Sequence, residues 1–303
     1  MKEITLSNRF LKIVVLPYGG IIKELWYDGI NVVLGNDDSE KYLKNPWYLG
    51  ACIGRYAGRL SSGYKINNEV YSIDHKDGIQ LHGGASGWDK ITWKVVDIFH
   101  GNNPQIILEH ECSEQNGSGH SGNIKTSIKY CLHESSLLIE YKASTSKTCP
   151  VNITNHSYFN LSGAPNLGDH ELLINSTKIL DLDDSLLPTG KFVEVSGTDF
   201  DFNKMKALGY SRYDDCFVLD NNNNNNDINA SLRALTTKIQ MDVVTDQPGI
   251  VVFNPKELNG ISLETQKFSN APNISHFPNT ILHPGEKYIQ KTKYSFSNFK
   301  SSI

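Results

Sequence analysis

The chain has 303 residues, of which 39% are hydrophobic and 20% charged, and its formal net charge is −4. This composition predicts a globular protein with a sizeable core, and the lack of a basic block argues against nucleic acid or an acidic membrane surface as its main partner. No apolar run approaches the length of a membrane span, and residues 1–6 lack the apolar core of a signal peptide, so we expect a cytoplasmic protein.

The cysteines and the glycine-rich segments show no cofactor or metal motif. The five cysteines are scattered and never spaced as Cys-x-x-Cys, so we expect reduced thiols rather than a disulfide framework or a zinc site. The segment 54–60 has two glycines and two arginines, but its spacing is not that of a phosphate loop and no Lys-Ser/Thr follows. We therefore expect neither a bound cofactor nor a metal.

The first half of the chain is a series of short apolar segments separated by glycine, asparagine and serine turns. Regular strands without intervening capped helices favour an antiparallel sandwich over a parallel βαβ sheet. The strand-like segments before residue 150 are 10–16, 21–27, 93–98, 105–109, 124–130 and 137–141.

The second half continues the same pattern. Its strand-like segments are 172–175, 177–180, 216–219, 239–245, 249–253, 260–264 and 293–296. Asparagines occupy residues 221–226, a low-complexity insert that we expect at a hairpin tip. No compositional linker divides the chain, so the fold prediction is all-β: residues 1–303 form one large single-domain antiparallel β-sandwich, with residues 221–226 as a loop insert.

The segment 151–161 carries an unusual set of polar side chains on a strand-like pattern. Apolar and polar residues alternate along it, which predicts a strand that bears His156. Imidazole, amide and phenol groups are costly to bury without partners. One interpretation is a structural histidine in a hydrogen-bonded core. The other is chemistry, which gains support from His82 beside a double glycine and from Glu264 on an apolar strand.

Two imidazoles and a carboxylate are the components of a general acid–base site. Burial would raise the pKa of Glu264 toward neutrality. Each residue also has an ordinary interpretation: His82 as an exposed loop histidine, Glu264 as a salt-bridged strand residue, and Arg59 as a surface arginine. The chemical interpretation requires that the fold bring His82, His156 and Glu264 together.

Taken together, these segments resemble the galactose mutarotase (aldose 1-epimerase) family over nearly the whole chain, from about residue 10 to 296. Each motif is weak alone, but their common order is specific. The matching motifs are Gly54-Arg55-Tyr56-Ala57-Gly58-Arg59, Leu81-His82-Gly83-Gly84, Asn155-His156-Ser157-Tyr158-Phe159-Asn160-Leu161, Leu187-Pro188-Thr189-Gly190, Asp214-Asp215-Cys216-Phe217, Leu263-Glu264-Thr265-Gln266, Phe277-Pro278 and Pro284-Gly285-Glu286.

The resemblance implies a β-sandwich with a sugar-binding cleft and cofactor-free exchange of the α and β anomers of free aldoses such as galactose and glucose. By motif position, Glu264 matches the catalytic base, His156 the catalytic acid and His82 the second site histidine. Arg59 and Asp214 match residues that hold sugar hydroxyls. We expect a monosaccharide as the only partner and a monomer.

Three departures from the family pattern bear on sugar preference. Gly58 stands where many members have asparagine, so that we expect one hydroxyl contact to be missing or made by water. Asp215 replaces a histidine. The segment 253–260 is shorter than usual, which would open one wall of the cleft.

Two other functions remain open at this stage. A glycosidase would use two carboxylates flanking a glycosidic bond, for which Asp214 and Glu264 are the candidate pair. A carbohydrate-binding or regulatory protein of the same fold would not catalyse at all, because a fold does not determine a function.

Overall fold

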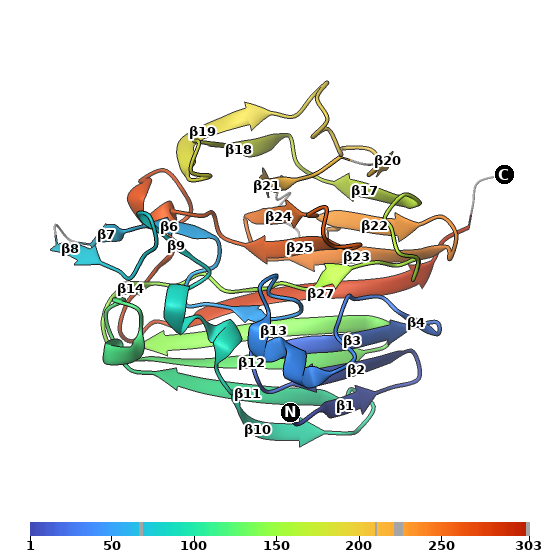
Figure 1. Cartoon of the computed structure of the whole chain (residues 1–303), viewed down its shortest axis with the longest axis horizontal. Helices are drawn as coiled ribbons and strands as arrows, with labels where there is room; N and C mark the ends of the chain where they lie inside the picture. Colours follow the sequence, from blue (N-terminus) through green and yellow to red (C-terminus); the bar gives the residue numbers. More distant parts are fainter. Residues whose placement is uncertain (67–68, 210, 221–226, 301–303) are drawn as a thin grey trace.

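The computed structural model of the chain describes residues 1–66, 69–209, 211–220 and 227–300 (Figure 1). The asparagine insert 221–226 lies outside the described residues, so its predicted loop is not tested. Within the described ranges there is no α-helix, and no helix there is long and apolar enough to cross a membrane. The short 3-10 helices are η1 (Ser39–Lys44), η2 (Gly84–Ser86), η3 (Trp88–Lys90), η4 (Glu114–Asn116) and η5 (Ala271–Asn273). The all-β prediction is confirmed.

A nine-stranded sheet forms one layer and spans the lower half and right side of Figure 1. Along its strands, inward-facing apolar residues alternate with exposed polar ones, as the period of two in a half-buried strand requires. In spatial order the strands are β10 (Lys94–Phe99), β11 (Gln105–Cys112), β12 (Ile124–His133), β13 (Ser136–Thr145), β27 (Tyr288–Asn298), β23 (Ile239–Thr245), β22 (Ala230–Ala234), β17 (His170–Ile174) and β20 (Lys206–Ala207).

A six-stranded sheet carries the functional pocket, and its strands β18, β19 and β21 lie at the top of Figure 1. One of its strands, β25 (Ile261–Gln266), is buried on both faces. In spatial order the strands are β16 (Tyr158–Phe159), β25 (Ile261–Gln266), β24 (Gly249–Phe253), β21 (Asp214–Val218), β18 (Lys178–Leu182) and β19 (Pro188–Glu194).

Smaller sheets complete the molecule. The four-stranded sheet contains β1 (Ile4–Ser7), β2 (Leu11–Leu16), β3 (Ile21–Tyr27) and β4 (Ile30–Asn31). The two-stranded pairs are β5 (Cys52–Ile53) with β15 (Thr154–Asn155), β6 (Arg59–Ser61) with β9 (Ile79–Leu81), β7 (Gly63–Ile66) with β8 (Glu69–Ser72), and β14 (Cys149–Pro150) with β26 (Ile281–Leu282). Every pairing between these strands is antiparallel, as predicted.

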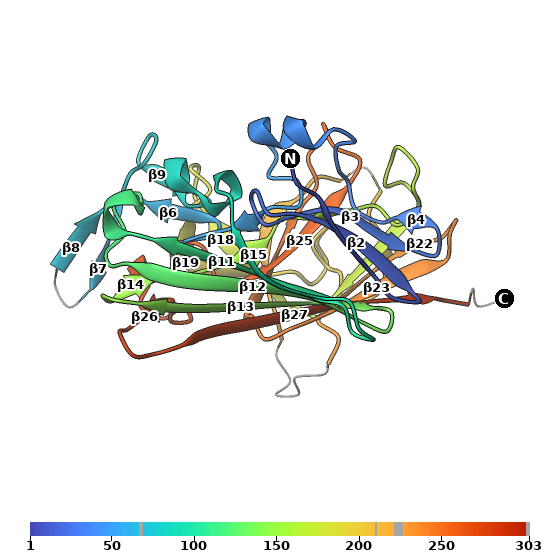
Figure 2. The ribbon, with the colours of Figure 1, turned by 90° about the horizontal axis from the view of Figure 1, so that it is seen from below.

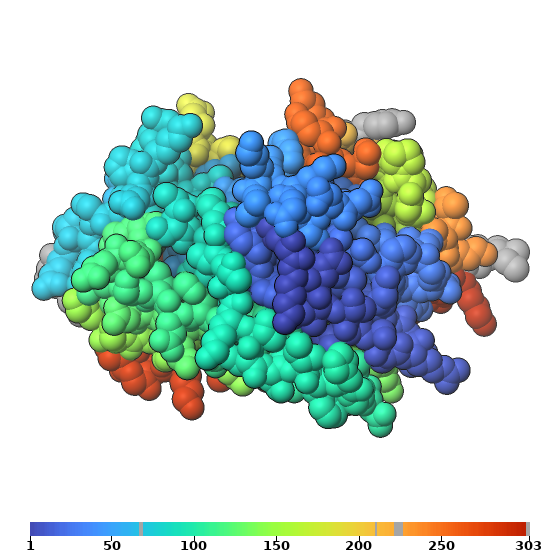
Figure 3. All heavy atoms as spheres, turned by 60° about the horizontal axis from the view of Figure 1, so that its bottom comes forward, coloured from blue at the N-terminus to red at the C-terminus, as the bar shows by residue number. Residues whose placement is uncertain are grey.

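The main apolar core contains residues of the nine-stranded, six-stranded and four-stranded sheets and joins segments from both ends of the chain. Phe159 of β16 packs on Tyr294 of β27 with ring centroids 5.1 Å apart, and the Tyr294 hydroxyl donates to the carbonyl of Leu263 on β25 at 3.3 Å. The turned view in Figure 2 shows the long strands β11, β12, β13 and β27 side by side. In Figure 3 the N-terminal residues, in dark blue, lie along the surface beside the blue-green residues that include β10.

The structure corrects the prediction of one continuous strand over residues 151–161. All eleven residues are buried, and the segment is divided between β15 and β16, which pair with different sheets. Several of its polar side chains donate to the backbone instead of facing solvent: the side-chain amide of Asn152 donates to the Ala57 carbonyl, and the Thr154 hydroxyl donates to the Thr265 carbonyl. The alternation therefore reflects a buried crossing between sheets, and His156 lies between the two short strands.

Candidate active site

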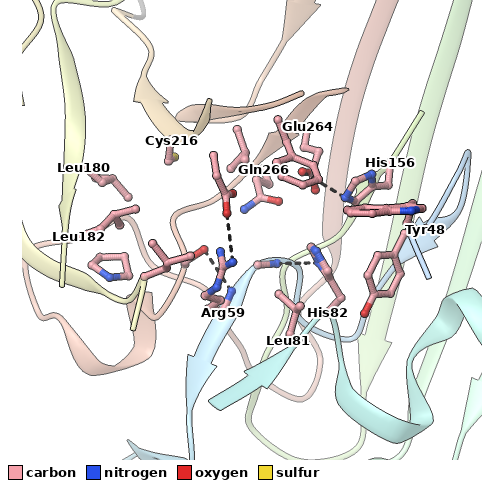
Figure 4. A pocket seen from close by; sticks show the side chains of 18 of the residues that line it. Tyr48, Arg59, Leu81, His82, His156, Leu180, Leu182, Cys216, Glu264 and Gln266 are labelled. Carbon is pink, nitrogen blue, oxygen red and sulfur yellow. Dashed lines mark hydrogen bonds and ion pairs between the residues drawn. The ribbon is translucent and has the colours of Figure 1, made fainter. Parts of the chain in front are cut away.

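A pocket lies against the face of the six-stranded sheet that points away from the main core (Figure 4). Its volume is about 170 Å³. Neighbouring strands contribute alternate residues to its floor, because side chains two apart on a strand share a face. The lining residues are Pro46, Trp47, Tyr48, Gly58, Arg59, Leu81, His82, His156, Tyr158, Leu180, Leu182, Leu186, Pro188, Asp214, Cys216, Val251, Phe253, Glu264, Gln266 and Ser269.

Glu264 lies on β25 with its carboxyl group buried in this pocket, and its side chain is 3% exposed. Burial, followed by the nearby charge of Asp214, raises the pKa of Glu264 to about 8, and Arg59 opposes this shift. The buried carboxyl oxygen Oε2 has no hydrogen-bond partner among the described residues. Glu264 therefore holds its proton near neutrality and can exchange it there, which a solvated glutamate cannot do.

His156 faces Glu264 from the crossing between β15 and β16. Its backbone is held on both sides, because its N–H donates to the Ala51 carbonyl at 2.9 Å and its carbonyl accepts from Gly50 at 3.0 Å. The Nε2 atom lies 3.5 Å from Oε1 of Glu264 (Figure 4). Burial lowers the pKa of His156 to about 4. The resting pair therefore favours a neutral imidazole beside a protonated carboxyl group.

His82 follows β9 and is buried, so the interpretation as an exposed loop histidine is wrong. The backbone N–H of Gly58 donates to Nδ1 of His82 at 3.2 Å. A backbone amide can only donate, so a neutral His82 carries its proton on Nε2. Burial, and then the proximity of His156, keeps the pKa of His82 well below its usual value. His82 therefore presents a fixed N–H donor without carrying charge.

An aromatic frame holds the two imidazoles in place. The rings of His82 and His156 meet edge to face with centroids 5.3 Å apart. Tyr48 packs against both, at 4.7 Å from His82 and 5.7 Å from His156, and Phe253 meets His156 at 6.2 Å. Burial, then the charge of Glu264, raises the pKa of Tyr158, so that its phenol remains a neutral donor in the lining. This packing fixes the orientation of the acid–base groups.

Arg59 and Asp214 form an ion pair at the other end of the pocket, with Nη2 and Oδ2 3.1 Å apart. Arg59 comes from β6 and Asp214 from β21, and both side chains are partly exposed to the pocket. The two groups offer the hydroxyls of a ligand a charged donor and a charged acceptor. The other arginine of this segment, Arg55, is buried and donates to the Ser121 carbonyl at 2.9 Å, so it is a structural residue.

His82, His156 and Glu264 also have the composition of a metal site. One ligand atom from each lies within 4.8 Å of the others. However, the Gly58 N–H occupies the lone pair of His82 at Nδ1 and leaves the proton on Nε2, so metal binding would require His82 to give up this hydrogen bond. The arrangement suits hydrogen-bond donation better than metal ligation, and the expectation of no metal remains a prediction.

The structure brings all five predicted site residues, namely Arg59, His82, His156, Asp214 and Glu264, into one pocket. Other lining residues were missed by the sequence analysis, notably Tyr48, Gln266 and Ser269. The sequence analysis assigned no strand or motif to the segment around Tyr48, and its aromatic neighbour Trp47 was the one available signal. Asp215 is absent from the lining and accepts a hydrogen bond from the Asp214 N–H at 3.1 Å, so its replacement of histidine places no new group in the pocket.

Comparison with known proteins identifies the family to which this fold belongs. The sequence model of the aldose 1-epimerase family matches residues 2–295. The chain belongs to this family. It is 31% identical to human galactose mutarotase over an alignment of 328 positions, which covers 98% of this chain and 94% of the relative. It is 30% identical to an aldose 1-epimerase from Escherichia coli, with 87% and 84% covered.

Solved structures of other aldose 1-epimerase family members have the same fold. An aldose epimerase homologue from C. elegans superposes with a TM-score of 0.91 at 26% identity, and the match covers 99% of each chain. The galactose 1-epimerase of Lactobacillus acidophilus superposes with a TM-score of 0.87 at 28% identity, covering 98% of this chain and 94% of that one. The predicted family and the galactose mutarotase-like sandwich are confirmed, and the chain is an isomerase of the mutarotase type.

Proposed function

We propose that this protein interconverts the α and β anomers of free hexoses such as galactose and glucose, with Glu264 and His156 as the proton-transfer pair. The observation that carries the proposal is the buried contact of 3.5 Å between these two groups in a pocket that also holds the Arg59–Asp214 ion pair. Galactose is the first substrate to test because relatives about one-third identical are named for it.

Ring opening moves two protons. Glu264 removes the proton of the anomeric hydroxyl while His156 donates a proton to the ring oxygen, and the bond between C1 and the ring oxygen breaks as the C1 carbonyl forms. Rotation about the C1–C2 bond exposes the other carbonyl face. His156 then removes the proton from the C5 hydroxyl, and Glu264 returns its proton to the carbonyl oxygen as the ring closes. No atom or electron is gained or lost.

This cycle requires one proton on the pair throughout. The closed sugar reacts with a carboxylate and an imidazolium, and the open sugar is held by a neutral carboxyl and a neutral imidazole. Both microstates contain one proton, so they belong to a single macroscopic state. With pKa values of about 4 for His156 and about 8 for Glu264, this state dominates between those limits. The pair therefore stays ready for exchange across neutral pH.

The other three residues position the sugar in this proposal. The Nε2–H of His82 donates to the ring oxygen, which becomes the C5 hydroxyl when the ring opens. The hydrogen bond from Gly58 fixes this tautomer of His82. Arg59 and Asp214 bind hydroxyls away from C1. Because this ion pair joins β6 to β21, it also holds two walls of the pocket in register. A displacement of ~1 Å in such contacts costs about a hundredfold in rate.

Polarimetry tests the proposal directly. Freshly dissolved α-galactose and α-glucose should approach their equilibrium rotation much faster with the protein than without it. Release of the aglycone from an aryl galactoside would instead support a glycosidase that uses Asp214 and Glu264. Binding of galactose without acceleration would support a non-catalytic sugar-binding protein. We also propose a cytoplasmic monomer, which fractionation and gel filtration test.

A further inference from the structure

Gly58 lies where a side chain would collide with two polar residues from the far end of the chain. Its φ is +76°, and a Cβ atom there would come within 2.2 Å of Ser269 Oγ and 3.2 Å of Gln266 Nε2. Both residues line the active-site pocket. The absence of a side chain at residue 58 therefore gives a hydroxyl and an amide access to one part of the pocket.

Gln266 is fully buried, and neither its Oε1 nor its Nε2 has a hydrogen-bond partner among the described residues. A buried amide without partners destabilises the fold. The contrast with Gln290 on β27 is direct: it is equally buried, but its amide donates to the Thr265 carbonyl at 3.0 Å and accepts from the Tyr288 hydroxyl. In Gln290, which lies outside the pocket lining, both polar atoms of the amide are therefore used.

The Ser269 hydroxyl is oriented by one hydrogen bond that it accepts, and among the described residues its own proton is unused. Its Oγ accepts the backbone N–H of Arg59 at 3.3 Å, which directs one lone pair toward β6. Within the described part of the chain, this hydroxyl donates no hydrogen bond of its own. Its proton is therefore available for an acceptor in the pocket.

We propose that Gln266 and Ser269 form a hydroxyl-binding subsite that selects aldoses with a hydroxyl at C3 or C4. This inference rests on the proposed function, because it takes Glu264 as the group at the anomeric carbon. Gln266 lies two residues beyond Glu264 on the same face of β25, a separation of roughly 7 Å along a strand. That distance reaches the side of a pyranose ring opposite C1. Figure 4 shows Gln266 between Glu264 and Arg59.

The subsite is a polar recognition element made by two residues whose positions the sequence analysis did not select. The amide offers a donor and an acceptor, and the hydroxyl offers a donor, so together they can satisfy one sugar hydroxyl in both of its roles. A site built to bind a hydroxyl discriminates strongly against an analogue that lacks it, because its own polar groups are then left unpaired.

The test compares parent sugar with deoxy analogues. For Gln266→Met and Ser269→Ala we expect kcat/KM on galactose to fall about five- to tenfold each, mostly through KM, because a neutral hydrogen bond is lost in ground and transition states alike. One of the two analogues, 3-deoxygalactose or 4-deoxygalactose, lacks the hydroxyl that the subsite binds. With that analogue, the variants and the unmutated enzyme should have the same kcat/KM. The control is Gln240→Met, which lies on β23 and outside the pocket lining. It should leave kcat/KM unchanged on galactose and on the deoxy analogues.

A rescue experiment separates recognition from folding. Gly58→Asn alone should impair activity because its side chain meets Ser269, whereas the double variant Gly58→Asn/Ser269→Gly should recover affinity by supplying an amide from the other side. Asparagine suits the test because it tolerates a positive φ. Gln266→Met should also unfold at no lower temperature than the unmutated protein, since it removes an amide without partners.

Equal losses on galactose and on both deoxy analogues would overturn the subsite, and so would a clear loss of thermal stability in Gln266→Met. If the unmutated enzyme accelerated no mutarotation, the proposed function would be wrong. In that case calorimetric titration with galactose decides the subsite alone: binding weakened by Gln266→Met supports it, and unchanged binding contradicts it.

Discussion

The two faces of β25 are equally buried but differ in how their polar groups are satisfied. On the face toward the nine-stranded sheet, Thr265 Oγ1 lies 2.6 Å from Thr292 Oγ1, and the Leu263 carbonyl accepts from Tyr294. On the pocket face, Glu264 Oε2 and both amide atoms of Gln266 have no partner among the described residues. One strand therefore presents a completed hydrogen-bond network on one side and unsatisfied polar groups on the other.

This difference teaches how to distinguish structure from function in a buried polar residue. Burial alone does not separate Thr265 from Gln266, since neither is appreciably exposed. Unpaired polar groups in the interior cost stability, so their persistence on one face points to a ligand that completes them. The core face specifies how the sheets pack, and the pocket face remains available for a sugar.

The largest expected effect follows from removing the proton acceptor on the pocket face. Glu264→Gln keeps the shape of the side chain but cannot accept a proton, so mutarotation should fall by about 10²–10⁴-fold with galactose binding largely retained. Polarimetric rates together with calorimetric binding check this. Near-normal turnover in this variant would show that Glu264 is not the base.

The two histidines should separate into different kinetic classes. His156→Ala removes the group that protonates the ring oxygen, so kcat should fall by about 10²–10⁴-fold. His82→Ala removes a positioning donor, so KM should rise by about tenfold with a smaller change in kcat. Steady-state kinetics on α-galactose give both parameters. A larger loss of kcat in His82→Ala than in His156→Ala would show that His156 is not the acid.

Stability should respond in opposite directions on the two faces. The pKa of Glu264 rises from 4.5 to about 8 on folding. Its contribution to the free energy of unfolding is therefore fully present below pH 4.5 and is lost as the pH rises through 8. Glu264→Gln should therefore gain free energy of unfolding relative to the unmutated protein between pH 4.5 and 8.

The matched variant on the core face is Thr265→Val, which should lose about 1 kcal/mol at every pH because it breaks the contact with Thr292. Urea unfolding at several pH values measures both. A stability difference between Glu264→Gln and the unmutated protein that stays constant from pH 4.5 to 8 would contradict the raised pKa of this carboxyl group.

Chelation should have the smallest effect. Because the Gly58 hydrogen bond keeps the proton of His82 on Nε2, we expect turnover to be unchanged after exhaustive treatment with EDTA and dialysis. The polarimetric assay before and after treatment, with each divalent metal added back, is the measurement. A loss that zinc or another metal reverses would show that His82, His156 and Glu264 hold an ion after all.

The sequence predicted the architecture because strand periodicity and turn residues are local signals. The segment 239–245 appears as β23 with the expected bounds, and the segment 124–130 appears as β12, which continues to His133. The five site residues were identified through motif order and the family resemblance, and the structure places them in one pocket. All five cysteines are free, as expected from their spacing.

Other features depend on tertiary contacts that no local pattern encodes. The polar alternation at 151–161 predicted one strand, but the segment is fully buried and crosses between sheets. The tautomer of His82 depends on Gly58, 24 residues away in the chain, and the space beside Gly58 is filled by Ser269. The charge state of the Glu264–His156 pair likewise follows from burial, which composition does not reveal.

The pH dependence of kcat/KM in the unmutated enzyme and in His156→Gln tests the one-proton pair most directly. The unmutated enzyme should show a plateau bounded by limbs near pH 4 and pH 8, where the pair gains its second proton and loses its last. In His156→Gln only ionised Glu264 can act, so the residual rate should rise through about pH 8 with no alkaline decline. An alkaline limb that persists in this variant, or a residual rate independent of pH between 6 and 9, would contradict the account.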